Sequence, residues 1–379
     1  MSRVLLGDVA KERRETFKSS KDGYPIVGLE HLTPEEIILT AWDEGKENTF
    51  SKLFREGDIL FGRRRAYLKK AAVAPFDGIC SGDITVIESI PERILPELFP
   101  FIIQNDALFE YAVRKSAGSL SPRVKWENLK NYEFELPDID KQRELAKILW
   151  AIDTTKKTYR KLLQKTDELV KSQFIEMFGD PVTNPMGWEV NRLEDITVFL
   201  TSGSRGWSGY FADDGEMFIT IKNVKNGSIL TDNMQYIHAP ETKEAERTRV
   251  KEDDLLISVT ADLGRTGVVN AEIANYGAYI NQHLSLVRLD KTRINPHFVS
   301  HYLETDAGKN QFESKNQVGV KAGLNFNAIN SLTVFIPPLE LQNQYISFVR
   351  HTDKSKFELE QALKELDSTY KKIISENLS

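Results

Sequence analysis

The sequence predicts an α+β fold in which two similar α/β domains alternate with two long helices. The helices pack as an antiparallel coiled coil, and the whole is an internal pseudo-two-fold repeat. A proline-led segment at residues 136–142 recurs 200 residues later at 336–342. Each copy precedes a heptad pattern of apolar residues in the same phase, and each follows a region of short strands and turns. We therefore divide the 379-residue chain into two globular domains at 1–138 and 182–337 and two helical regions at 139–181 and 338–379.

The two globular regions show the same order of predicted elements. In the first, strands are expected at 24–27, 58–61 and 83–87, with a helix from Pro96 towards Ala112. In the second, strands are expected at 218–221, 254–257 and 284–287, with a helix beginning near Pro296. Early in each half the spacing drifts, so residues 6–9 correspond to 193–196 and residues 57–60 to 253–256. One shared fold with loops of different lengths accounts for this drift.

The two helical regions carry the strongest periodicity in the chain. Apolar residues recur at alternating steps of three and four with charged flanks, which is typical of a coiled-coil seam. At about 1.5 Å per residue, roughly 35 residues give a rod of about 50 Å. Two ordinary core helices are the alternative, but the shared phase and register favour the coiled coil. The predicted seam residues are Leu145, Ile148, Ile152, Tyr159, Leu162, Leu163, Leu169, Phe348, Leu359, Leu363, Leu366 and Ile373.

Composition excludes several classes of protein. No run of 18 apolar residues is present, which argues against a membrane span, and the first residues do not resemble a signal peptide. Cys80 is the only cysteine, so no internal disulfide can form and a reducing, cytoplasmic location is expected. A formal net charge of −6 argues mildly against a general polyanion binder, but DNA binding depends on local clusters of positive residues.

Such clusters occur in the first half. Residues 63–70 follow a predicted strand and hold five basic residues in eight, which suits phosphate contacts and, through arginine, guanine edges. A solvated hairpin tip is the alternative for this run, and a plain surface loop for the second cluster at 114–125. The candidate DNA-binding residues are Arg63, Arg64, Arg65, Tyr67, Lys69, Lys70, Arg114, Lys115, Ser119, Arg123 and Lys125.

The second half is less basic and richer in side chains that read bases. Asn and Gln pair with adenine, and several lie at predicted strand ends. Each of these residues, taken singly, is more simply read as part of the fold or surface, but DNA contact explains the set better. The candidates are Ser204, Arg205, Trp207, Lys222, Asn223, Arg265, Gln282, His283, Asn316 and Lys321. Because the loops of the two halves differ, the DNA sequences that the two halves read should differ as well.

Catalytic motifs are not found. The chain contains neither a Gly-x-x-x-x-Gly-Lys-Ser/Thr phosphate loop nor a glycine-rich methyltransferase loop, and its six His residues lack metal-ligand spacing. Asp213-Asp214 and Asp253-Asp254 are better explained by structural roles than by metal binding, and Cys80 by burial. We expect a non-catalytic protein with no cofactor or metal in this chain.

The chain resembles the DNA-specificity subunit of type I restriction–modification enzymes. The residues that carry the resemblance are Leu136-Pro137 through Gln142, Ile336-Pro337-Pro338-Leu339 through Gln342, and Met177-Phe178-Gly179-Asp180-Pro181 followed by Asn184-Pro185-x-Gly187-Trp188. It implies a scaffold for two methyltransferase subunits, which carry S-adenosylmethionine, and for two ATP-driven restriction subunits in the full enzyme. Each recognition domain would read half of a split site in double-stranded DNA, with a spacer fixed by the helices. The alternative is a protein-interaction adaptor with a coiled-coil spacer.

Overall fold

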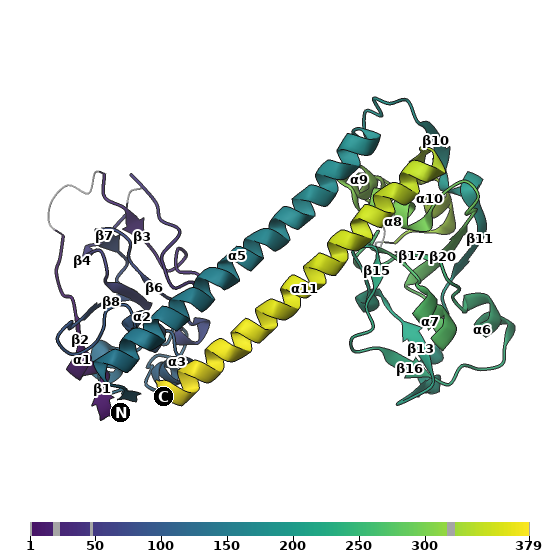
Figure 1. The fold of residues 1–379 in the computed structure, drawn as a ribbon. Helices are drawn as coiled ribbons and strands as arrows, with labels where there is room; N and C mark the ends of the chain where they lie inside the picture. Colours follow the sequence, from purple (N-terminus) through teal and green to yellow (C-terminus); the bar gives the residue numbers. More distant parts are fainter. Residues whose placement is uncertain (1, 18–22, 46–47, 317–322, 379) are drawn as a thin grey trace. The chain divides into compact units, whose positions relative to one another are not determined.

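The computed structural model describes residues 2–17, 23–45, 48–316 and 323–378. The chain forms two compact units, of which unit 1 comprises residues 1–163 and 358–379 and unit 2 comprises residues 164–357. Two long helices, α5 (Ile139–Phe178) and α11 (Leu339–Asn377), each contribute a segment to both units. Each unit therefore combines one globular domain with one end of each long helix (Figure 1).

Unit 1 contains a four-stranded antiparallel sheet in the order β2-β8-β5-β6 and a three-stranded sheet in the order β3-β7-β4. Strand β1 pairs with β9 in a separate ribbon. The strands are β1 (Ser2–Leu5), β2 (Ala10–Glu12), β3 (Ile26–Val27), β4 (Lys52–Phe54), β5 (Ile59–Gly62), β6 (Ala71–Val73), β7 (Gly78–Cys80), β8 (Ile84–Ser89) and β9 (Glu133–Leu136). The short helices are α1 (Leu6–Val9), η1 (Ala66–Leu68), α2 (Phe99–Ile103), α3 (Asp106–Arg114) and α4 (Trp126–Leu129).

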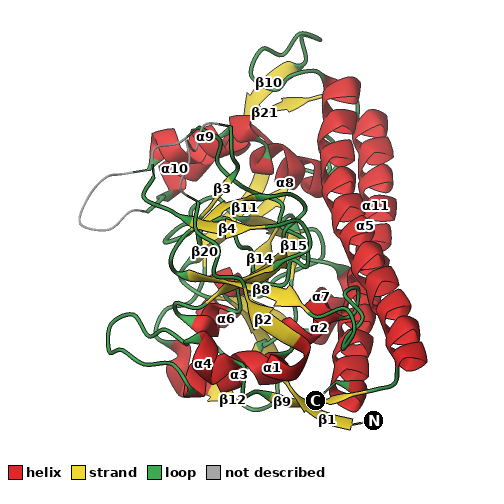
Figure 2. Cartoon of the chain, turned by 90° about the vertical axis from the view of Figure 1, so that its left-hand side faces the viewer, coloured by secondary structure: helices red, strands yellow, loops and turns green. Residues whose placement is uncertain are grey.

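Unit 2 contains four-stranded sheets in the orders β11-β20-β17-β18 and β12-β16-β13-β19, with the pairs β10-β21 and β14-β15. Its strands are β10 (Glu189–Arg192), β11 (Thr197–Ser202), β12 (Phe211–Ala212), β13 (Glu216–Ile219), β14 (Val224–Lys225), β15 (Ser228–Ile229), β16 (Gln235–Ile237), β17 (Leu255–Ser258), β18 (Thr266–Val268), β19 (Ala278–Ile280), β20 (Leu284–Leu289) and β21 (Thr333–Ile336). Its short helices are η2 (Leu193–Ile196), η3 (Trp207–Tyr210), η4 (Ile221–Asn223), α6 (Lys243–Thr248), α7 (Ala271–Tyr276), α8 (Pro296–Glu304), α9 (Asp306–Lys315) and α10 (Phe326–Asn330). Figure 2 shows β10 and β21 beside the end of α5 and the start of α11.

The predicted correspondence between the halves is confirmed by equivalent hydrogen bonds. The amide of Leu6 donates to Tyr132 O at 2.8 Å, and the amide of Leu193 donates to Leu332 O at 2.7 Å. Gly62 faces Ile84 in unit 1, as Ser258 faces Leu284 in unit 2. The helix expected from Pro96 to Ala112 is two helices, because the Asn105 side chain accepts from the amide of Ala107 and starts α3.

A buried glutamine joins each globular domain to its long helix. Gln142 accepts from the amide of Leu95 at 2.9 Å and donates to Pro137 O at 2.8 Å. Gln342 accepts from the amide of Asn295 at 2.8 Å and donates to Pro337 O at 2.7 Å. Leu95 and Asn295 lie directly before Pro96 and Pro296, near the start of the helices that follow in each globular domain. The glutamine of each proline-led repeat therefore fixes this part of the domain to the start of the long helix in both units.

The long helices pack antiparallel within each unit. In unit 1, Leu145 and Leu149 of α5 share a core with Ile374 of α11 and with Leu378, which directly follows α11. In unit 2, the ring of Phe174 near the end of α5 lies 5.5 Å from that of Tyr345 near the start of α11. Equivalent ion pairs lie between the helices, Lys156 with Asp367 in unit 1 and Lys356 with Asp167 in unit 2.

The predicted seam is correct for most positions and wrong for three. Leu145 and Ile152 are buried, and Tyr159, Leu163, Phe348, Leu359, Leu363, Leu366 and Ile373 are half-buried. Ile148, Leu162 and Leu169 are 38%, 45% and 51% exposed. The neighbouring Leu149, which was not predicted, is buried, and Leu163 and Val170 are half-buried. At 3.6 residues per turn a strict seven-residue stripe drifts around the helix, so where two adjacent positions are both apolar the sequence does not reveal which one is buried.

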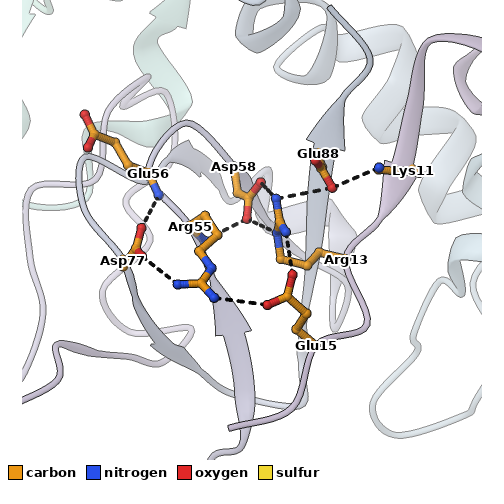
Figure 3. A network of polar contacts seen from close by, with 8 residues as sticks. All are labelled: Lys11, Arg13, Glu15, Arg55, Glu56, Asp58, Asp77 and Glu88. Carbon is orange, nitrogen blue, oxygen red and sulfur yellow. Dashed lines mark hydrogen bonds and ion pairs between the residues drawn. The ribbon is translucent and has the colours of Figure 1, made fainter.

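In each unit, a buried aspartate lies directly before an interior strand of a four-stranded sheet. Asp58, at the start of β5, accepts two hydrogen bonds from Arg13 at 2.6 and 3.1 Å (Figure 3). Asp254, at the start of β17, accepts two from Arg288 at 2.7 Å each. Figure 3 shows Arg13 also reaching Glu15 and Glu88. These contacts support the predicted structural role of Asp254, and donation to Asp58 raises the pKa of Arg13.

Two further sequence-based expectations concern membranes and Cys80. Within the described residues, none of the helices has the length and apolar character needed to span a membrane. Cys80 is fully buried, and burial raises the pKa of its thiol to about 12. The thiol therefore stays protonated and inert at neutral pH, as the sequence predicts.

Candidate nucleic-acid interface

The two basic clusters of unit 1 meet at the end of strand β5. Arg64 and Arg123 form an isolated antiparallel bridge. The amide of Arg65 donates to Pro122 O at 2.8 Å, and the amide of Val124 donates to Arg63 O at 3.0 Å. Residues 63–70 and 114–125, which the sequence singled out separately, thus form one site.

Asp83, just before β8, organises this site. Its carboxylate accepts from Arg123 at 2.7 Å and from Arg64 at 3.3 Å. Partial burial would raise the pKa of Asp83, but the two guanidinium groups outweigh it and hold that pKa below its usual range. The charged carboxylate therefore orients both arginines, and their side chains remain 36% and 40% exposed. Sequence analysis missed Asp83. An acidic residue at the start of one predicted strand, in a chain with three consecutive arginines at the end of another, could have indicated an ion pair between them.

The other unit 1 candidates divide into exposed cations and groups engaged by the fold. Arg65, Tyr67, Arg114, Lys115, Ser119 and Lys125 are exposed. Lys69 is exposed too and is paired with Asp106. Lys70 is half-buried and donates to Leu29 O at 2.7 Å, so its ammonium serves the fold. Arg63 is half-buried and its backbone links the strand ends.

Unit 2 places a different set of side chains on the same frame. The amide of Val259 donates to His283 O at 3.0 Å, as the amide of Arg63 donates to Asp83 O at 3.0 Å. Thr260 and Gly323 form an isolated antiparallel β-bridge, as Arg64 and Arg123 do in unit 1. Thr260 Oγ1 lies 2.7 Å from His283 Nδ1, and Gln282 Nε2 lies 3.1 Å from His283 Nε2. With the amide nitrogen donating, His283 carries its proton on Nδ1 and donates to Thr260.

Among the unit 2 candidates that the structure describes, Arg205 and Lys222 are exposed. The loop that holds Arg205 lies against β19, because the amide of Ser204 donates to Ile280 O at 2.9 Å. Gly203 makes this approach possible, since a Cβ there would lie 1.9 Å from Asn281 O. Lys222 is exposed on η4, and half-buried Arg265 pairs with Asp262 at 2.6 Å. Asn316 is half-buried, and Lys321 lies outside the described residues.

Three unit 2 candidates are wrong as DNA contacts. Ser204 is fully buried and lies 3.0 Å from Thr248 Oγ1. Trp207 is 5% exposed and stacks on Phe218, and Asn223 is 4% exposed and accepts from the amide of Thr220. The Ser-Gly-Ser-Arg-Gly-Trp stretch resembled a flexible aromatic loop, but its aromatic ring fills a small core. Neighbouring glycines let the chain turn that ring inward, which composition alone does not reveal.

Comparison with known proteins identifies the family. The family model for the type I restriction modification DNA specificity domain matches residues 3–166 and 185–366. The chain belongs to this family. As a specificity subunit, it is a non-catalytic, DNA-recognising component of a type I restriction–modification system.

Relatives and solved structures agree with this assignment. The putative type I restriction enzyme MjaX specificity subunit of Methanocaldococcus jannaschii is 22% identical over 93% of this chain and 87% of its own length. The EcoDI specificity subunit of Escherichia coli is 25% identical over 40% of this chain and 36% of its own. The type I system S subunit from M. genitalium has a TM-score of 0.63 at 13% identity, covering 98% of this chain and 94% of that one. A chain from a structure describing complex assembly and conformational transition of the type I R-M system has a TM-score of 0.59 at 20% identity, covering 99% and 97%. The two structures support the fold of the specificity subunit.

Proposed function

We propose that this specificity subunit reads an asymmetric, bipartite DNA site, one half with each globular domain. The observation that carries the proposal is the shared frame with unlike side chains. Unit 1 presents Arg64, Asp83 and Arg123 where unit 2 presents Thr260, His283 and Gly323. Arginine donates to guanine edges, whereas the amide and imidazole of the Gln282–His283 pair suit other edges. The same backbone arrangement carries different side chains in the two units, and each unit therefore reads a different half-site.

The proposal includes partners. Two equivalent ends of the coiled coil offer the same interhelical features twice, so we propose that two methyltransferase subunits bind and carry S-adenosylmethionine. In the full enzyme two restriction subunits would join them. Because the substrate is cellular DNA, the assembly acts in the cytoplasm. The long helices set a single spacer length between the half-sites.

The experiment that tests this proposal is methylome mapping. The chain is co-expressed with its methyltransferase partner, and methylated bases are mapped across the genome. We expect a split motif with a constant spacer that disappears when this chain is omitted. Replacing residues 1–138 with another recognition domain should change one half of the motif, and replacing 182–337 should change the other half.

Other outcomes would reject it. Simultaneous change of both halves after one replacement contradicts modular reading. An active, well-formed complex without any motif favours the protein-interaction adaptor. Adding one helical turn to both α5 and α11 should lengthen the spacer. An unaltered spacer would contradict the proposal that the helices set its length.

A further inference from the structure

A short hairpin in unit 1 carries the most exposed large apolar side chain among the described residues. The amides of Ala117 and Arg123 donate to each other's carbonyl oxygens at 3.0 and 2.9 Å. Gly118 has φ +113°, a conformation that side chains rarely adopt, and lets the chain turn there. Leu120, between the two paired residues, is 90% exposed.

The hairpin is fixed to the basic site. Ser121 Oγ accepts from Arg64 at 3.1 Å, and Pro122 O accepts from the amide of Arg65 at 2.8 Å. Arg123 is held by Asp83. Leu120 is therefore presented by a braced element, and projecting it costs little further ordering when a ligand binds.

The surroundings of Leu120 indicate its partner. Isolated exposed apolar residues are ordinary on protein surfaces. Here, however, the hairpin that carries Leu120 is hydrogen-bonded to Arg64 and Arg65 and itself contains Arg123. The turn η1, which follows Arg65 in the chain, exposes Tyr67 and Leu68 at 54% and 43%. An apolar tip on a hairpin that is anchored by arginines is complementary to nucleic acid, whose phosphates lie outside and whose stacked bases are apolar.

We propose that Leu120 is a wedge that enters between two stacked bases at or beside the half-site read by unit 1. This inference rests on the proposed function and deepens it. The arginines bind the backbone and base edges, and the leucine side chain replaces part of the lost stacking. Because the ease of unstacking depends on the base step, Leu120 adds specificity at a step that no hydrogen bond reads.

The test uses the complex with its methyltransferase partner and duplexes that contain its mapped target. 2-Aminopurine, whose fluorescence rises on unstacking, is placed singly at positions across and beside the unit 1 half-site, excluding the methylated adenine. We expect the wild-type complex to raise the fluorescence several-fold at one step. Leu120→Ala should abolish that rise and weaken binding about tenfold, while Leu120→Met should retain both. The salt dependence of binding should not change, because no phosphate contact is removed.

The controls separate this inference from the proposed function. Leu230→Ala, an exposed leucine of unit 2, should leave the signal unchanged. An undiminished rise with Leu120→Ala, or no rise at any step while the wild-type complex binds its target specifically, overturns the wedge. Loss of methyltransferase association in Leu120→Ala would assign the leucine to a protein contact and also overturn it. If the wild-type complex prefers no duplex, the proposed function itself fails.

Discussion

The two globular domains share a backbone frame and differ in the side chains at the ends of equivalent strands. In unit 1, two arginines are held by one carboxylate between β5 and β8. In unit 2, a threonine, a histidine and a glycine occupy the equivalent places between β17 and β20. The backbone hydrogen bonds agree to within about 0.1 Å, because they belong to the sheet. A shared frame therefore leaves the side chains at its strand ends free to differ, which the proposed reading of two different half-sites requires.

The largest expected effect concerns the buried acids on which both frames depend. Arg288→Leu leaves Asp254 with a fully buried, unpaired carboxylate, which should cost about 3–5 kcal/mol of unfolding free energy. Arg13→Leu should cost a similar amount in unit 1, since Asp58 is 4% exposed. Urea denaturation followed by tryptophan fluorescence measures both. Arg288→Leu combined with Asp254→Asn should recover part of the loss, and wild-type stability of Arg288→Leu alone would contradict the argument.

The next effect tests the unlike side chains on DNA. Arg64→Ala and Arg123→Ala should each weaken specific binding by about 1–3 kcal/mol, whereas Thr260→Ala should cost less because a neutral hydroxyl makes a weaker contact. Equilibrium titration of the complex against target duplex gives these values. The arginine variants should lose nothing on a duplex whose unit 1 half-site is scrambled. Arg14→Ala, an exposed arginine paired with Glu12 and Glu127, serves as the control. An equal loss of binding affinity in Arg14→Ala would show that Arg64 and Arg123 do not contribute more than other exposed arginines.

A third comparison uses pH. Position 301 is histidine in unit 2, whereas the equivalent position in unit 1 is Phe101. Burial, with the nearby positive charges of His297 and Lys356, lowers the pKa of His301 to about 4. As the pH falls below about 6.5, His301 therefore binds a proton in the unfolded chain but not in the folded unit. Stability is retained above that pH and falls as the pH drops from about 6.5 towards 4.

Replacing this histidine should remove that acid sensitivity. His301→Phe should lose less stability than the wild type between pH 7 and pH 5, by on the order of 1–2 kcal/mol. Denaturation at the two pH values measures the difference. His351→Phe, which alters an exposed histidine of α11, should behave as the wild type does. The same acid loss in His301→Phe and the wild type would contradict the assignment.

The smallest effect distinguishes the two interhelical ion pairs. Lys156 is 12% exposed and lies 5.2 Å from the centre of the Tyr370 ring, whereas Lys356 is 26% exposed and the position equivalent to Tyr370 is Val170. Lys156→Met should therefore cost up to about 1 kcal/mol and Lys356→Met a few tenths. Denaturation in low and high salt measures both. A larger loss for Lys356→Met would show that the cation–π contact does not distinguish the two ends.

Much of the fold was predictable because it depends on local patterns and a repeat. The proline-led segments, the long helices and the strands at 58–61, 254–257 and 284–287 all appear close to their predicted places. Site residues were less predictable. Arg64 and Arg123 were singled out because charge clusters are visible in sequence, and their role in DNA binding stays a prediction. Ser204, Trp207 and Asn223 are buried, because polar or aromatic loop residues can equally satisfy a core.

The sequence by itself determined the internal repeat, the family, the helix–strand order and the two clusters of positive charge. These depend on residue type and on spacing along the chain. Only the tertiary structure decided that residues 63–70 and 114–125 form one site, that Asp83 organises it and that Leu149 rather than Ile148 faces the core. Such facts depend on which side chain points inward and on contacts between distant segments. Tertiary packing sets both the direction of a side chain and the contacts between distant segments. A drift of one residue around a helix, or a turn at one glycine, is enough to move a side chain from the surface to the core.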